Sequence, residues 1–99
     1  MKLWIDDVRP SPEGYIWCTT VDFAKKMIQW GEILYGPIEV LDIDHDAGEY
    51  AQYGGDYIRL LDWLEETGRN YPIRIHSMNP VGAANMRAII ERNDWTEVR

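Results

Sequence analysis

Acidic, histidine and other polar side chains follow three separate apolar segments of the chain. They are Asp6 and Asp7, then Asp44, His45 and Asp46, and finally His76, Ser77 and Asn79. Carboxylates a few ångströms apart repel one another by about 4 kcal/mol per pair at an effective dielectric near 20. A hard divalent cation relieves that repulsion and leaves room for a phosphate. We therefore expect Mg²⁺ or Mn²⁺ at Asp7, Asp44 and Asp46.

Each of these residue types also has a purely structural explanation. Asp44 and Asp46 are suited to capping the turns that follow a strand. Asp42 lies two residues before Asp44, so it points to the same face and either joins the cluster or pairs with a basic side chain. The only histidines, His45 and His76, can share general acid and base duties, or they only hydrogen-bond the nearby loops.

A phosphate site is expected where the last helix begins. Asn79 can cap this helix, with Pro80 at its first position. Ser77 and Asn79 precede the helix, and the backbone N–H groups of Val81 and Gly82 make an anion site. Gly82 permits close approach of a ligand, although a packing role explains it equally well.

The elements that position these residues alternate along the chain. Residue types predict strands at 1–7, 15–20, 37–46 and 71–77, and apolar spacing predicts helices at 19–31, 56–68 and 79–93. The first helix is expected to be capped by Thr19 or Thr20 and to end at Gly31. The tail 94–99 forms a short last strand or closes the surface.

This alternation predicts an α/β fold. The sheet is expected to be mostly parallel, with four or five strands, about three helices, and helices on both faces in a three-layer arrangement. In such sheets the functional crevice lies at the carboxyl ends of the strands. The polar groups that follow the strands should therefore converge there.

Composition limits the classes of protein. The chain has 99 residues, which we interpret as one domain over 1–99. Its 17 acidic and 10 basic residues give a net charge of −7, which argues against a broad nucleic-acid surface but not against a local site for a nucleotide end. Cys18 is the only cysteine, so we expect a buried thiol and a reducing, cytoplasmic setting. No apolar run is long enough for a bilayer, and no membrane association is expected.

Three motifs together resemble the receiver domain of two-component response regulators. They are WIDD, LDIDHD and IHS, and they imply a small flavodoxin-like fold. The resemblance implies that Asp6 and Asp7 are the metal-binding acidic pair and that Asp44 takes the phosphoacceptor place. It makes Asp46 the position whose backbone carbonyl helps to bind Mg²⁺, and Ser77 the switch hydroxyl. The fifth-strand lysine, the fifth strand and helix, and the helix between strands one and two are missing, so the domain is truncated relative to other receivers.

The chain resembles cyclic-phosphate-processing receiver domains more closely. The matching segments read WIDDVRP, DIDHDAG and HSMNPVGAANM and span Trp4 to Met86. This resemblance implies a repurposed site that acts on cyclic phosphate ends of RNA or nucleotides. We interpret the chain as a metal-dependent phosphoesterase with His45, His76 and Asp44 as catalytic residues.

Two other functions are compatible with the sequence. One is a non-catalytic binding or signalling module, in which metal and phosphate reshape the loop 47–55 to present a surface to a partner protein. The other is an acidic protein-interaction domain, which requires no convergence of the strand ends.

Overall fold

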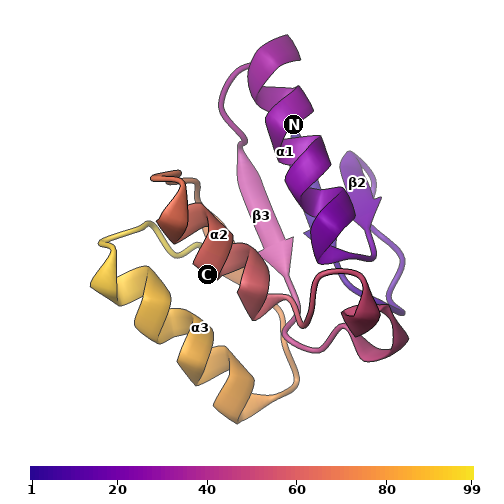
Figure 1. Ribbon diagram of the computed structural model, residues 1–99, viewed down its shortest axis with the longest axis vertical. Coiled ribbons are helices and arrows are strands. Elements are labelled where there is room, and N and C mark those ends of the chain that lie inside the picture. Colours follow the sequence, from indigo (N-terminus) through magenta and orange to yellow (C-terminus); the bar gives the residue numbers. More distant parts are fainter.

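The computed structural model describes residues 1–99 and is built on a four-stranded, all-parallel sheet (Figure 1). The strands are β1 (Lys2–Ile5), β2 (Tyr15–Cys18), β3 (Val40–Ile43) and β4 (Ile73–Ile75), in the spatial order β2-β1-β3-β4. Ile5 is aligned with Cys18 and with Ile43, and Ile43 is aligned with Ile75. The carboxyl ends of all four strands therefore meet at one edge of the sheet.

Three α-helices and one short 3₁₀ helix connect the strands. They are α1 (Val21–Leu34), the 3₁₀ helix η1 (Gly48–Gln52), α2 (Ile58–Glu66) and α3 (Pro80–Arg92). Thr20 caps α1 by accepting a 3.0 Å hydrogen bond from the Phe23 N–H, and Asn79 caps α3 by accepting one of 3.0 Å from the Gly82 N–H. The cap at Asn79 was predicted from the sequence, and Thr20 was one of the two candidates, with Thr19, for the cap of α1. No helix combines the length and apolar character that a membrane span needs.

α1 ends at Leu34 rather than at Gly31, where the sequence predicted its end. Gly31 is buried inside the helix, and a Cβ there would lie 2.7 Å from the Met1 sulfur and 3.0 Å from the Ile38 Cδ1. The chain instead leaves the helix region through Gly36, whose φ of +91° suits glycine. Close packing, not helix termination, therefore accounts for the glycine at position 31.

The buried side chains of the three helices form one apolar cluster with alternate residues of the strands. Leu3 and Ile5 of β1, with Leu41 and Ile43 of β3, belong to this cluster and share one face of the sheet. α2 lies between α1 and α3 and contacts both (Figure 1). The predicted α/β, truncated receiver-like fold is confirmed. Its helices, however, cover one face of the sheet, not the two faces expected of a three-layer arrangement.

The one-sided helical layer follows from the strand order. The connection from β2 through α1 to β3 and the connection from β3 through α2 to β4 run in the same direction along the sheet. Right-handed crossovers that run in one direction put their helices on the same face. A helix on the other face would need a crossover in the opposite direction, and the only such connection, from β1 to β2, is the short segment 6–14.

The face opposite the helices carries aromatic and polar side chains. The Trp4 indole N–H donates to the Arg9 carbonyl at 2.8 Å, and the Trp17 indole N–H donates to the Asp6 carbonyl at 2.8 Å. These bonds hold the segment 6–14 against the sheet. Asp42 lies on the same face as Trp4, because the two residues are aligned across β1 and β3.

The C-terminal tail adds a single bridge to the sheet. The Ile73 N–H donates to the Thr96 carbonyl at 3.0 Å, and the Val98 N–H donates to the Ile73 carbonyl at 2.7 Å. Ile73 and Glu97 are thereby paired in parallel. The expected four or five strands are thus four strands and this bridge.

Candidate functional site

Three carboxylates meet at the carboxyl edge of the sheet. Asp6 and Asp7 follow β1, Asp44 follows β3, and one oxygen from each lies within 4.8 Å of the others. We call this group the carboxylate cluster. The Asp44 N–H donates to the Ile5 carbonyl at 2.9 Å, which joins the two strand ends. The pairing of β1 with β3 therefore brings together charges that lie far apart in the sequence.

Asp6 is fully buried and is held at both carboxylate oxygens. Its Oδ1 accepts hydrogen bonds from the N–H groups of Val8 and Arg9, each at 3.0 Å, and its Oδ2 lies 2.8 Å from the His76 Nε2. Burial raises the pKa of Asp6, but the N–H groups of Arg9 and Val8 and the His76 ring outweigh it, so the pKa lies below its ordinary value. About one of the four lone-pair directions of this carboxylate remains for another ligand.

Asp7 is the least stabilised member of the carboxylate cluster. Burial raises the pKa of Asp7, its own backbone N–H opposes that effect, and the charges of Asp6 and Asp44 raise the pKa further, to a net value above the ordinary one. Gly48 lies against this carboxylate, since a Cβ there would be 2.6 Å from the Asp7 Oδ2. Position 48 also has a φ of +56°, so glycine is favoured there both by space and by backbone conformation.

The negative charge of the cluster also acts on Tyr57. Burial raises the pKa of this phenol, and the charges of Asp7, Asp6 and Asp44 raise it further. Tyr57 stays neutral and donates its hydroxyl proton to the Thr19 carbonyl at 2.8 Å. The cluster is thus a region of negative potential.

The carboxylate cluster suits a hard divalent cation. Asp7 and Asp44 have no basic side chain within ion-pair distance, whereas Asp6 has His76 and, at 4.0 Å, Arg9. Carboxylate oxygens are the ligands that Mg²⁺ and Mn²⁺ prefer. The Asp46 side chain, which the sequence placed among the metal ligands, lies outside the cluster.

Asp46 contacts His45 and the start of α3. The His45 Nδ1 lies 2.7 Å from the Asp46 Oδ1, and the Asn79 side-chain amide reaches the same carboxylate at 3.4 Å. The His45 ring packs on Gly82, where a Cβ would lie 2.4 Å from the His45 Cγ. No protein group is hydrogen-bonded to the His45 Nε2. Asp46 therefore favours the tautomer that carries Nδ1–H, and Nε2 is left to exchange a proton with a ligand.

Both ring nitrogens of His76 are hydrogen-bonded to buried carboxylates. Its Nδ1 lies 2.7 Å from the Asp42 Oδ1 and its Nε2 lies 2.8 Å from the Asp6 Oδ2. Its ring stacks on Trp4 at a centroid separation of 3.9 Å, and its side chain is 6% exposed. Asp42, for which the sequence left two roles open, pairs with His76 and with Arg74, whose Nη1 is 3.2 Å away. Neither ring nitrogen of His76 faces a ligand.

The start of α3, where a phosphate site was expected, is partly occupied by its own cap. The Asn79 Oδ1 accepts a hydrogen bond from the Gly82 N–H, and the Ser77 Oγ accepts a hydrogen bond of 3.0 Å from the Asn79 N–H. Pro80 has no N–H, and the Val81 N–H has no hydrogen-bond partner. The Ser77 hydroxyl proton and the Val81 N–H are therefore the groups left for an anion.

Several residues of the site were not assigned from the sequence. Trp4 and Arg74 support His76 and Asp42, and the only signal for them is strand alternation, which puts Trp4 and Asp42 on one face. The loop 47–55 contains η1 and exposes Tyr50 and Tyr53. A role for this loop in binding a partner protein stays a prediction.

A truncated parallel sheet with an acidic cluster at its carboxyl edge defines a receiver-like domain. Comparison with family models matches residues 1–92 to the cyclic-phosphate processing receiver domain. The chain belongs to this family. No curated protein and no solved structure gives a significant match.

Proposed function

We propose that this chain is a metal-dependent phosphoesterase that opens cyclic phosphate ends of RNA or nucleotides. Membership of the cyclic-phosphate processing family supports the substrate class. The observation that carries the reaction type is a histidine nitrogen without a hydrogen-bond partner, His45 Nε2, on the residue that follows Asp44 of the carboxylate cluster. A proton-transfer group beside a cation site is what hydrolysis of a phosphodiester requires.

The carboxylate cluster has the role of holding the cation. Asp7 and Asp44 supply free carboxylate oxygens, and Asp6 supplies its remaining lone pair. A bound Mg²⁺ or Mn²⁺ neutralises charge on the phosphate oxygens. The Ser77 hydroxyl and the Val81 N–H donate hydrogen bonds to the same phosphate group.

His45 moves the protons. Its Nε2 takes a proton from the water that attacks phosphorus, while one of the two phosphorus–oxygen bonds of the ring breaks. The departing ribose oxygen lies on the opposite side of phosphorus and takes its proton from solvent, and His45 releases its own proton to solvent, so one water is consumed and a phosphomonoester forms. Asp46 orients the ring through Nδ1, and Gly82 leaves the space that the ring occupies.

His76 has a positioning role in this proposal rather than the catalytic role that its position in the sequence suggested. It is hydrogen-bonded to Asp6 and Asp42 and stacked on Trp4, so it holds Asp6 in one orientation. Its ring nitrogens have no free direction for a substrate proton.

The test is hydrolysis of a nucleoside 2′,3′-cyclic monophosphate by the purified chain, with Mg²⁺ or Mn²⁺ and with EDTA. We expect a phosphomonoester, detected by chromatography, only when the cation is present. His45→Gln should abolish turnover and keep metal binding, whereas Asp44→Asn should abolish both. Gln29→Glu, on the exposed surface of α1, is the matched control and should keep full activity.

The outcome that contradicts the proposal is equally defined. If the folded, cation-bound chain leaves 2′,3′-cyclic nucleotides and cyclic-phosphate RNA ends unchanged, the phosphoesterase assignment is wrong. If His45→Gln retains full activity, the proton-transfer role belongs to another group.

A further inference from the structure

α1 carries two apolar stripes, and only one of them is used in the core. The inner stripe is buried against the sheet and consists of Val21, Ala24, Ile28 and Gly31. The second, which we call the outer stripe, consists of Phe23, Met27, Trp30 and Leu34. Of these, Phe23, Trp30 and Leu34 are 44%, 60% and 68% exposed.

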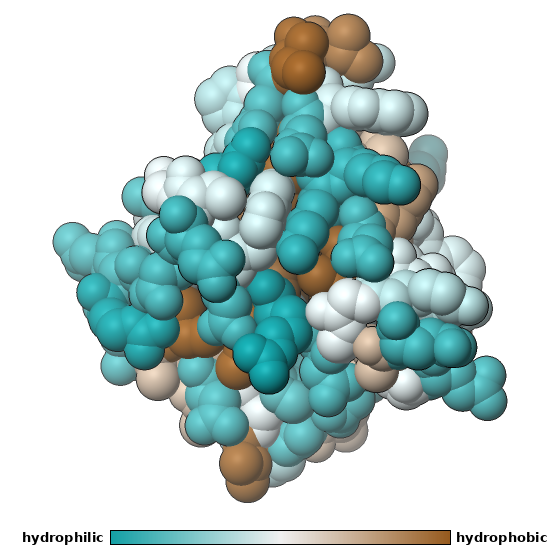
Figure 2. Space-filling model, viewed as in Figure 1, coloured by the Kyte–Doolittle hydropathy of each residue, from teal (hydrophilic) through white to brown (hydrophobic).

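The outer stripe has the spacing of a surface that packs against another helix. Its members are separated by four, three and four positions, which is the a/d spacing of helix pairs. Ile33 and Tyr35 extend the apolar surface at the end of α1. Figure 2 shows apolar side chains gathered at this end of the molecule, while most of the same view is hydrophilic.

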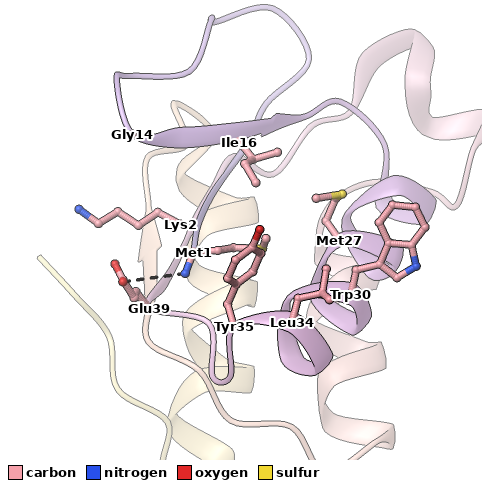
Figure 3. A pocket seen from close by; sticks show the side chains of 9 residues that line it. All are labelled: Met1, Lys2, Gly14, Ile16, Met27, Trp30, Leu34, Tyr35 and Glu39. Atoms are coloured by element: carbon pink, nitrogen blue, oxygen red, sulfur yellow. Dashed lines mark ion pairs between the residues drawn. The ribbon is translucent and has the colours of Figure 1, made fainter.

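A groove of about 600 Å³ lies beside the outer stripe, next to the edge strand β2. Ile16, Met27, Leu34 and Tyr35 are among the residues that line it, and the Trp30 ring stands at its side (Figure 3). The surface thus combines a projecting ring with a hollow. A two-fold symmetric contact needs such self-complementarity, because the same patch faces itself.

We propose that the outer stripe and this groove form a homodimer interface in which the α1 helices of two copies pack antiparallel. A two-fold axis midway between Met27 and Trp30 sets Trp30 of one copy opposite Met27 of the second copy. The same axis sets Phe23 opposite Leu34, because the two pairs share one midpoint in the sequence. Every member of the outer stripe then has an apolar partner.

The exposed apolar side chains supply most of the area that a stable dimer needs. If each large apolar side chain has an area of about 150–250 Å², the exposed fractions of Phe23, Trp30, Leu34, Ile33 and Tyr35 add up to roughly 600 Å² per copy. A stable interface of standard size buries about 800 Å² on each partner.

The charges of α1 permit self-association through this helix in spite of the net charge of the chain. The net charge of −7 makes two copies repel one another. The carboxylate cluster lies at the carboxyl edge of the sheet, whereas α1 carries two lysines, Lys25 and Lys26, and two carboxylates, Asp22 and Glu32. Contact through α1 therefore brings together two helices whose own charges balance.

The test is the mass of the full chain in solution, measured by sedimentation or by light scattering from micromolar to submillimolar concentration. We expect a concentration-dependent species of twice the 11.6 kDa of one chain. Leu34→Glu should raise the dissociation constant about tenfold or more, because it buries an unpaired carboxylate. Gln29→Glu adds the same charge outside the outer stripe and should leave the dimer intact. A chain that stays monomeric, or a dimer that Leu34→Glu leaves unchanged, overturns the proposal.

A cross-linking experiment tests the register. Met27→Cys and Trp30→Cys proteins, mixed under oxidising conditions, should form disulfides mainly between the two variants. Cys18 is buried and does not compete. Preferential cross-linking within either variant alone would overturn the antiparallel arrangement. Neither experiment depends on phosphoesterase activity, so its outcome is independent of the proposed function.

Discussion

Replacing Asp7 with asparagine is the most direct perturbation of the carboxylate cluster. The Asp7 oxygen lies within 4.8 Å of oxygens of Asp6 and Asp44. At that distance the repulsion of two unit charges is about 1 kcal/mol in water and about 3.5 kcal/mol at an effective dielectric of 20. Asp7 is half-buried, so the repulsion lies between these limits, and we expect the metal-free variant to be at least about 1 kcal/mol more stable. For a domain of this size its melting temperature should rise by about 4–8 °C.

The pH dependence gives a second readout of the same variant. Burial, Asp6 and Asp44 raise the pKa of Asp7 above its ordinary value of 3.8, so ionised Asp7 destabilises the folded chain above that raised pKa. The destabilisation disappears as the pH falls through the raised pKa towards 3.8. The difference in stability between the variant and the native chain should therefore be full at neutral pH and should shrink in mildly acidic buffer.

Metal addition offsets the difference in stability between the two chains. A cation that binds only the folded native chain stabilises it by about 1.4 kcal/mol at ten times its dissociation constant. Asp7→Asn should lose most of that gain in a melting experiment with Mg²⁺ against EDTA. Asp46→Asn, which changes a carboxylate outside the cluster, should keep it. If Asp7→Asn leaves the metal-free melting temperature unchanged and still responds to Mg²⁺, the electrostatic reasoning is wrong.

Three further perturbations probe other parts of the site and the core. His76→Gln removes a buried ring that is hydrogen-bonded to Asp6 and Asp42 and should cost at least about 1–3 kcal/mol of unfolding free energy in urea; a loss within error would show that the ring is dispensable. Gly82→Ala inserts a Cβ 2.4 Å from the present His45 Cγ, so it should lower turnover by up to about 10²-fold with only a small change in melting temperature. Unchanged turnover in that variant would mean that the ring position does not matter. Burial raises the pKa of the Cys18 thiol to about 12, so a thiol reagent at mildly alkaline pH should react only after unfolding, and rapid labelling of the folded chain would contradict its burial.

Local sequence patterns were sufficient for the elements and their caps. Apolar periodicity predicted four strands and three helices. The cap at Asn79 was predicted, and the cap of α1 was narrowed to Thr19 or Thr20, because a cap depends on residues only a few positions apart. The error at Gly31 has a tertiary cause. A glycine near a helix end signals either termination or close packing, and only the positions of Met1 and Ile38 distinguish the two.

The layer arrangement depends on strand order, which local patterns do not encode. The alternation of strands and helices predicts a parallel sheet, but the face on which each helix lies depends on the direction of each crossover. The segment 6–14 is too short for a crossover helix, and both remaining crossovers run the same way. For these two reasons all the helices lie on one face, and the sheet has no second helical layer.

The sequence by itself determined which chemical groups stand at the strand ends, because those groups follow directly from the apolar runs that precede them. Only the tertiary structure decided which of these groups belong to the carboxylate cluster and which contact other residues. Strand register groups Asp6 and Asp7 with Asp44, whereas Asp46 turns to His45 and Asn79. Two histidines that look equivalent in the sequence become different, since one keeps a free ring nitrogen and the other is buried between two carboxylates. The reason is physical: residue type sets what a side chain can donate or accept, and packing sets which partners it meets.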